Sequence, residues 1–194
     1  MKDKEIEIKI KIDDRDALTK KVEALGGIFK ERGNEMDVLY DDGKGFYDAH
    51  KVLRLRKADK TNVLTYKEKL PKSTSFNLLE RMELQTEVGD YQIMDDIIKH
   101  LGFVPYRIKE KKYEDYLLDG LKVEFHTVAF LGDFIEIETE DINKLKIVLG
   151  KLGLNLEQGI NRDYGTLFSE YCEQHNLPKD TPCTFEAEQR SLPH

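Results

Sequence analysis

Charged residues alternate with apolar ones near the start of the chain, and the charges come in pairs of one sign. In the segment 4–12, Glu5 and Glu7 precede Lys9 and Lys11. Two carboxylates supply the oxygen ligands that a divalent cation such as Mg²⁺ takes, and two ammonium groups attract phosphate oxygens. The order of acids and bases along this segment therefore suits a divalent cation held next to a phosphate chain.

Like-charged pairs on one side of a strand return further along the chain, in segments of their own. The basic residues of this set are Lys9, Lys11, Arg54, Arg56, Lys67, Lys69, Arg81 and Lys111, and the acidic ones are Glu5, Glu7, Glu83, Glu87, Glu136 and Glu138. Like charges on one side of a strand repel each other, which is unfavourable unless something neutralises them. A bound polyanion would neutralise the bases, and a divalent cation would neutralise the acids. The alternative is a set of strands with one face in water, and the spacing alone leaves both interpretations open.

These spacings predict β-strands, because successive side chains in a strand point to opposite faces. In the first segment Ile6, Ile8, Ile10 and Ile12 share the face opposite the charges, so this face is expected to pack against a hydrophobic partner. The same reasoning, with Asp119-Gly120 as a hairpin turn, predicts strands near 4–12, 28–40, 52–56, 63–69, 79–88, 103–118, 121–128 and 134–138. Antiparallel strands closed into a barrel would bring both sets of charges into one lumen.

Helices and a tail complete the predicted organisation. Apolar residues at helical spacing, followed by glycine, predict helices over 16–25, 90–101 and 142–152. Residues 154–171 are predicted to add a short strand and a helix, and the prolines after them indicate a loosely ordered end. The expected architecture is an α+β domain over residues 1–172, built on a closed barrel with flanking helices, and a C-terminal tail over 173–194.

The composition restricts the partners that this chain is expected to have. Acids outnumber bases among its 194 residues, and the net charge of −7 argues against nucleic-acid binding through a basic face. No apolar run approaches the roughly 20 residues of a membrane span, and the first residues lack the apolar core of a signal peptide. A cytoplasmic protein is the expectation. Cys172 and Cys183 are too few for a disulfide framework, and their spacing with His175 and His194 fits no common zinc pattern.

With these residues laid out, the sequence resembles the CYTH family, which is named after class IV adenylate cyclase and thiamine triphosphatase. Its members are also called triphosphate tunnel metalloenzymes. The first shared motif is ExExK, which Glu5, Glu7 and Lys9 complete. The resemblance covers residues 4 to about 170, since further motifs follow in the family's order at 37–41, 53–56, 64–67, 81–83, 111–116 and 131–138.

The resemblance implies a fold, a ligand and a metal. The fold is an antiparallel β-barrel tunnel of about eight strands. The implied triphosphate contacts are Lys9, Lys11, Arg54, Arg56, Lys67, Lys69, Arg81 and Lys111, with Lys9 and Lys67 as catalytic residues. The implied ligands of Mg²⁺ or Mn²⁺ are Glu5, Glu7, Glu136 and Glu138. Positively charged side chains would hold the non-bridging oxygens, and the metal would activate the attacking oxygen.

Three positions depart from the family's pattern. The arginine that the family often carries before its tyrosine is absent from Lys111-Lys112-Tyr113, where Lys109 or Lys112 offers only a substitute charge. Gln85 replaces an acid, and His126 stands where cyclase-like members carry one. A histidine in such a place acts either as an acid or base in the tunnel or as a hydrogen-bonded structural residue, and we favour the structural role.

The function that follows is a class IV adenylate cyclase-like reaction, in which the ribose 3′-hydroxyl of ATP attacks the α-phosphate and releases pyrophosphate. One alternative is hydrolysis of inorganic tripolyphosphate or thiamine triphosphate, with water attacking the terminal phosphate. The other is a non-catalytic module that binds a triphosphate or polyphosphate. The expected partner is a nucleoside triphosphate or another small triphosphate, with no nucleic acid and no membrane, and cyclase-type relatives make a homodimer a possible assembly.

Overall fold

The computed structural model describes residues 4–46, 49–69 and 79–191, and within these ranges the side chains of 4–6, 69 and 79–81 are not described. Its centre is a sheet made of β1 (Lys4–Lys11), β2 (Ile28–Asp41), β3 (Lys51–Ala58), β4 (Asn62–Lys69), β5 (Leu79–Val88), β6 (Val104–Leu118), β7 (Leu121–Val128) and β8 (Gly132–Thr139). Each strand pairs with two antiparallel neighbours, in the order β1-β5-β4-β3-β2-β6-β7-β8, and β8 returns to β1. The predicted α+β fold with a closed antiparallel barrel is confirmed.

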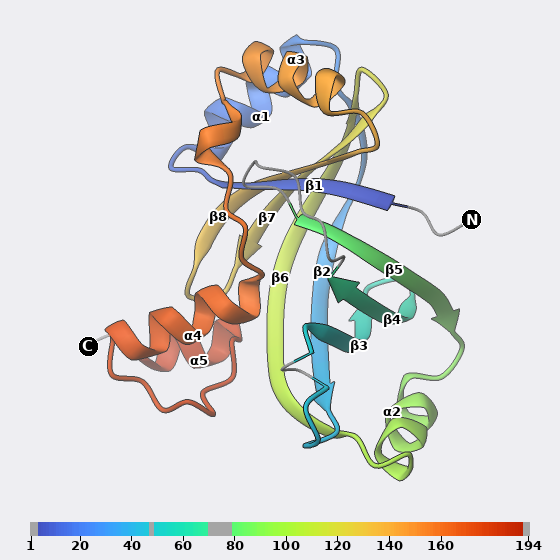
Figure 1. Ribbon diagram of the computed structural model, residues 1–194. Coiled ribbons are helices and arrows are strands. Elements are labelled where there is room, and N and C mark those ends of the chain that lie inside the picture. Colours follow the sequence, from blue (N-terminus) through green and yellow to red (C-terminus); the bar gives the residue numbers. More distant parts are fainter. Residues whose placement is uncertain (1–3, 47–48, 70–78, 192–194) are drawn as a thin grey trace.

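The first strand closes the barrel because it pairs with two strands that are distant in the chain. Residues 4–7 of β1 pair with β5, and residues 6–11 pair with β8. Strands β2 and β6 are the longest, and they run side by side along one wall (Figure 1). The β2–β6 register shifts near one end of this wall, where Leu39 lies opposite Arg107 but the next residue, Tyr40, lies opposite Pro105.

Helices flank the barrel, and the described chain contains α1 (Arg15–Ala24), α2 (Tyr91–His100), α3 (Ile142–Leu152), α4 (Tyr164–Gln174) and α5 (Phe185–Ser191). The first four begin after an aspartate whose carboxylate accepts from backbone N–H groups of the first turn, namely Asp14, Asp90, Asp141 and Asp163. Helices α1 and α3 lie together over one end of the barrel, while α4 and α5 pack further along its side (Figure 1). None of the described helices has the length and apolar character needed to cross a membrane.

The apolar face of β1 has the hydrophobic partner that the sequence predicts. Ile8, Ile10 and Ile12 are buried in one cluster with Val22 of α1 and Leu145 of α3. A second buried cluster joins α4 to the turn between β7 and β8. These clusters lie against the outer face of the strands, so the alternate residues of the same strands are left to line the interior.

The end of the chain is more ordered than the sequence predicts. Cys183 lies beside β6, where its N–H donates to the Ile108 carbonyl at 3.0 Å and its carbonyl accepts from the Glu110 N–H at 2.8 Å. Cys172 and Cys183 are free thiols buried in the same cluster. The described residues 173–191 are therefore not a loose tail, because apolar side chains around the prolines pack onto the barrel and hold this segment in place.

Two smaller expectations concern the C-terminal part: a short strand within 154–171, and a set of possible zinc ligands that includes His194. The stretch 154–171 contains a 3₁₀ helix (Leu156–Gln158) and the start of α4 instead of a short strand, since Asn155 caps the 3₁₀ turn with its side chain. His194, the last member of the unlikely zinc set, lies outside the described residues.

Candidate functional site

A cavity of about 110 Å³ opens inside the barrel, bordered at one side by α4 and Cys183. We call it the cationic cavity, because lysine and arginine side chains from β1, β3, β4 and β6 point into it. The predicted site residues that line it are Glu7, Lys9, Arg54, Arg56, Lys67, Lys111 and Glu136. Residues that are far apart in the chain thus meet in one place, since each stands on the inward face of its own strand.

The other predicted site residues lie elsewhere or outside the described part. Lys11 is exposed at the last position of β1, with its ammonium 6.0 Å from the Phe134 ring, so it is not part of the cavity lining. Glu138 lines a separate opening together with Glu83 and Lys122. The side chains of Glu5, Lys69 and Arg81 lie outside the described residues, although their backbones pair within β1, β4 and β5.

Several interior residues were not assigned to the site from the sequence. Asp37 and Lys109 line the cationic cavity, and Glu35 and Glu124 point into the barrel next to it. Period-two alternation with Lys111 indicates that Lys109 faces the interior as well, and does not merely offer a substitute charge. Lys112, the other candidate substitute, is exposed on the outer face, with its ammonium over the Phe185 ring.

Asp37 is the buried carboxylate at the centre of the basic residues. Its Oδ1 accepts from Arg56 Nε at 2.7 Å, and its Oδ2 lies 3.0 Å from Lys109 Nζ. Burial by itself opposes ionisation of Asp37, but the charges of Arg56, Lys109 and Arg54 outweigh it and hold the pKa of this carboxyl well below its usual range. Asp37 therefore stays ionised and orients the side chains of both Arg56 and Lys109.

The like-charged pairs of the sequence find their counter-charges on neighbouring strands. Lys67 lies directly opposite Glu83 in the β4–β5 pairing, and their charged atoms are 2.5 Å apart. Arg56 of β3 lies opposite Asp37 of β2 in the same way. Cross-strand carboxylates thus already supply counter-charges for these basic side chains, in addition to the bound polyanion that the sequence suggests.

Lys9 is buried and stands between two carboxylates. Its Nζ lies 3.1 Å from Glu136 Oε1 and 3.4 Å from Glu7 Oε1. The same ammonium lies over the face of the Tyr164 ring, 4.4 Å from its centroid. Glu7 and Glu136 thus converge on a single positive charge.

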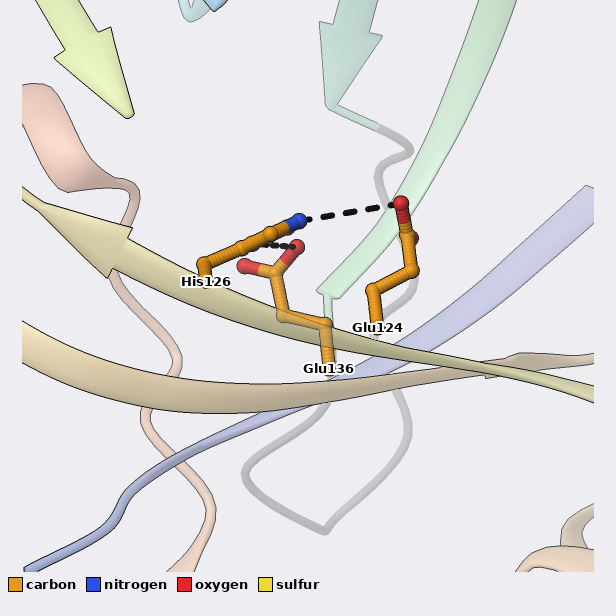
Figure 2. Close-up of side chains that lie close together, drawn as sticks. All are labelled: Glu124, His126 and Glu136. Carbon is orange, nitrogen blue, oxygen red and sulfur yellow. Dashed lines mark ion pairs between the residues drawn. The ribbon is translucent and has the colours of Figure 1, made fainter. Parts of the chain in front are cut away.

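His126 is fully buried and contacts four polar side chains. Nδ1 lies 3.2 Å from Glu136 Oε2 and 3.1 Å from the Tyr164 hydroxyl, and Nε2 lies 2.8 Å from Lys111 Nζ and 3.6 Å from Glu124 Oε1. Figure 2 shows the imidazole between the two carboxylates. Burial and Lys111 act to lower the pKa of His126, but the two glutamates raise it above its ordinary value. These contacts fit the hydrogen-bonded structural role that the sequence favoured.

The donor atoms around Lys9 and His126 suit a divalent cation. Glu124, His126 and Glu136 each offer one ligand atom, and these atoms lie within 4.8 Å of one another. Glu136 Oε1 is buried and accepts no hydrogen bond, although it faces the Lys9 ammonium. Since Mg²⁺ and Mn²⁺ take carboxylate oxygens, Glu7 and Glu136 fit the predicted metal, and Glu124 adds an oxygen that the sequence argument did not include.

A further group of carboxylates lies beside the pair Glu7 and Glu136, since Glu138 is opposite Glu7 and Glu124 is opposite Glu136 in the strand pairing. We call it the acidic cluster, and it consists of Asp115, Glu124 and Glu138 around Lys122. The ammonium of Lys122 lies 2.8 Å from Glu124, 3.7 Å from Asp115 and 3.9 Å from Glu138. Burial and the facing Glu124 raise the pKa of Asp115 to about 6. Burial opposes ionisation of Glu124, but His126, Lys122 and Lys111 outweigh it and hold the pKa of this carboxyl well below its usual range. Asp115 differs from Glu124 in this respect, because its raised pKa makes it take up a proton more readily than an ordinary aspartate.

The family model for the CYTH domain matches residues 3–164. The chain belongs to the CYTH family. A relative from Methanocaldococcus jannaschii, described as a candidate adenylate cyclase, is 30% identical over 151 residues, which are 76% of this chain and 85% of that protein. A conserved hypothetical protein from Pyrococcus furiosus is also 30% identical, with a TM-score of 0.71 over 82% of this chain and 97% of that one. A Hippeastrum protein, described as a candidate adenylyl cyclase with a dominant triphosphatase activity, shares the fold at 17% identity and a TM-score of 0.67, over 86% of this chain and 95% of that one.

Membership of the CYTH family confirms the resemblance that begins with the ExExK motif. The matched CYTH region ends at Tyr164, so most of α4 and all of α5 lie beyond it. The cationic cavity includes residues from both parts, because Phe168 and Cys183 line it together with the CYTH barrel. The segment after the matched region is therefore part of the cavity wall in this chain.

Proposed function

We propose that the cationic cavity binds a triphosphate together with Mg²⁺ or Mn²⁺, and that the protein converts ATP to cyclic AMP and pyrophosphate as class IV adenylate cyclase does. One observation carries this proposal. Cations from four strands line one cavity, namely Lys9, Arg54, Arg56, Lys67, Arg107, Lys109 and Lys111. So many fixed positive charges at close quarters suit a compact polyanion, and phosphoryl transfer depends mainly on positioning and charge stabilisation.

The cross-strand carboxylates give the cations their orientation before any ligand arrives. Asp37 fixes Arg56 and Lys109, and Glu83 fixes Lys67. A bound triphosphate would bring its non-bridging oxygens to these cations, with bidentate contacts available from the guanidinium groups. Because little side-chain reorganisation is needed, these charges are placed to stabilise the charge that develops on the phosphates.

The metal and the catalytic lysines have defined places in this proposal. Glu7 and Glu136 would hold the divalent cation, with Glu5 and Glu138 as further predicted ligands, and the bound cation would act as a Lewis acid toward the phosphate oxygens. Lys9 contacts both Glu7 and Glu136, and its ammonium would contact an oxygen of the bound phosphate chain. Lys67 faces the same cavity from β4 and would contact the transferred phosphate chain.

A second candidate function is hydrolysis of tripolyphosphate or thiamine triphosphate, which the activity described for the Hippeastrum protein supports. A third is a non-catalytic binder, which the departures at Gln85 and His126 support. All three use the cationic cavity. They differ only in whether a ribose hydroxyl, a water molecule or nothing attacks the bound phosphate.

Product analysis separates the three functions. Purified protein is incubated with Mn²⁺ and either ATP, tripolyphosphate or thiamine triphosphate, and cyclic AMP, pyrophosphate and phosphate are measured. We expect the wild type to form cyclic AMP and pyrophosphate from ATP. This activity should be lost in Lys67→Ala and retained in Lys112→Ala, because the Lys112 side chain is on the outer face. Release of phosphate without cyclic AMP would contradict the cyclase function and support hydrolysis. Tight binding without any product would support the non-catalytic binding function.

A further inference from the structure

Arg107 differs from every other cation that lines the cationic cavity. The other six each have a carboxylate within 4.0 Å, for example Lys9 with Glu136 and Arg54 with Asp37. Arg107 has no carboxylate partner among the described residues: its Nη2 donates to Ser169 Oγ at 3.1 Å, and its guanidinium lies 5.4 Å from the centre of the Phe168 ring. Its Nη1 is buried without a hydrogen-bond partner. The side chain thus presents an unused donor at the cavity.

A local irregularity of β6 accounts for the position of Arg107. Leu39 pairs with Arg107 and Tyr40 with Pro105, so Tyr106 is an extra residue in this strand. A bulge of this kind redirects side chains and is often found beside functional sites. As a result both Tyr106 and Arg107 line the cavity, although adjacent residues of a regular strand point to opposite faces.

Arg107 has apolar neighbours on β2, β3 and α4, although Asp163 at the start of α4 also lines the cavity. Leu39, Val52 and Phe168 line the cavity together with Arg107. Two residues further along their strands, roughly 7 Å away, Leu39 gives way to Asp37, Val52 to Arg54 and Arg107 to Lys109. The ionic layer suits phosphates, whereas an apolar wall disfavours a bare phosphate because the charge would lose its water.

We propose that Arg107, Leu39, Val52 and Phe168 form a subsite for the organic group of a triphosphate ester, and that Arg107 Nη1 donates to an oxygen or nitrogen acceptor on that group. The inference rests on the proposed binding of the triphosphate in the ionic layer. The phosphate chain then lies among Arg54, Lys67 and Lys109, and the organic group extends toward α4. Arg107 is a specificity-determining residue in this arrangement, and the chain selects organic triphosphates over inorganic tripolyphosphate.

Binding measurements on Arg107→Met test the subsite, because methionine keeps an unbranched side chain against Phe168 but removes the donors. ATP, tripolyphosphate and tetrapolyphosphate are titrated calorimetrically in EDTA, so that the metal-dependent step cannot consume them. We expect the Kd of ATP to rise about tenfold or more, as for loss of a hydrogen bond to a charged donor, and the Kd values of the two inorganic ligands to change less than about twofold. Ser169→Ala serves as the control for contacts between Arg107 and α4, and we expect it to change all three Kd values less than about twofold.

Other outcomes overturn the inference in distinguishable ways. Equal losses for ATP and tripolyphosphate would make Arg107 one more phosphate-binding cation, and a loss for tetrapolyphosphate equal to that for ATP would assign it to a fourth phosphate. Unchanged ATP binding would leave Arg107 a structural contact of α4. In each of these cases wild type still binds tripolyphosphate, so the proposed function stands. If wild type binds none of the ligands, the proposed function fails and the subsite fails with it.

Discussion

Two buried aspartates on neighbouring strands, Asp37 of β2 and Asp115 of β6, have pKa values that shift in opposite directions. Asp37 in the cationic cavity has a pKa well below its usual range, whereas Asp115 in the acidic cluster has a pKa raised to about 6. Both are desolvated, so burial alone does not decide the direction. The difference lies in the neighbours, since Asp37 contacts Arg56 and Lys109, while Asp115 faces Glu124 and shares one lysine with it. The sign of the neighbouring charges therefore decides whether a buried aspartate in this barrel keeps its charge or takes up a proton.

The largest effect is expected for Asp37→Asn, which removes the shared counter-charge of two buried cations. Breaking a buried ion pair in this way costs about 3–5 kcal/mol of unfolding free energy. Urea denaturation at pH 7 measures the loss. The matched variant is Asp115→Asn, which relieves repulsion with Glu124 and is expected to leave stability equal or higher. Losses of similar size in both variants would contradict the electrostatic difference between the two regions.

The next effect concerns turnover and distinguishes a lysine inside the barrel from one on its outer face. Lys67→Ala removes a cation of the phosphate-binding layer, and we expect kcat/KM with the active triphosphate to fall on the order of 10²-fold or more. Lys112→Ala, on the outer face of β6, is expected to keep wild-type kcat/KM. Steady-state kinetics with Mn²⁺ measure both, and circular dichroism checks that the variants are folded. Wild-type activity in Lys67→Ala would remove this residue from the site.

Glu7→Gln tests the metal contribution separately from phosphate binding. We expect Mn²⁺ affinity to fall about tenfold, because one carboxylate ligand becomes a weaker neutral one, with loss of turnover as the consequence. Mn²⁺ binding is followed by electron paramagnetic resonance of the free ion. Tripolyphosphate affinity in EDTA is expected to be equal or higher, since the variant carries one negative charge less. Unchanged Mn²⁺ affinity would show that Glu7 is no ligand.

The smallest effect is a pH dependence of stability that comes from Asp115. Its pKa in the folded state is raised, so between about pH 6 and pH 4 the folded protein binds a proton that the unfolded chain does not. Protonation of Asp115 therefore raises the free energy of unfolding as the pH falls through that range, and its deprotonation lowers this free energy as the pH rises. Asp37 behaves in the opposite sense, because its low folded pKa contributes stability above about pH 4 that is lost on further acidification.

Comparing urea denaturation of wild type and Asp115→Asn at pH 4.5, 5.5 and 6.5 isolates the Asp115 contribution. We expect the stability advantage of the variant to shrink as the pH falls, because protonation of Asp115 removes the repulsion that the substitution removes. A constant difference between the two proteins at all three values would contradict the raised pKa.

Much of the site follows from the sequence because alternation is a local property. Glu7, Arg54 and Lys67 each stand on the charged face of a short strand, and closure of the barrel turns these faces inward. The same rule misplaces Lys11, because β1 ends at this residue and its side chain reaches solvent at the rim. Alternation also indicates Lys109, once β6 is read as one continuous strand.

Strand register and the packing of the last segment are not local properties, and the sequence therefore does not predict them. The pairing of Lys67 with Glu83 depends on how β4 and β5 align, which no single segment specifies. The bulge at Tyr106 likewise arises from the pairing of β2 with β6. The order of residues 173–191 depends on contacts of Cys183 with β6, which prolines in the sequence do not reveal.

The central claim is that the inward charges of separate strands form one triphosphate-binding site. Calorimetric titration of tripolyphosphate tests it most directly, with wild type compared with Lys67→Ala and Lys112→Ala. The account predicts one site per chain in wild type and in Lys112→Ala, and binding at least about tenfold weaker in Lys67→Ala. Absence of binding to wild type, or equal affinity in all three proteins, would contradict it.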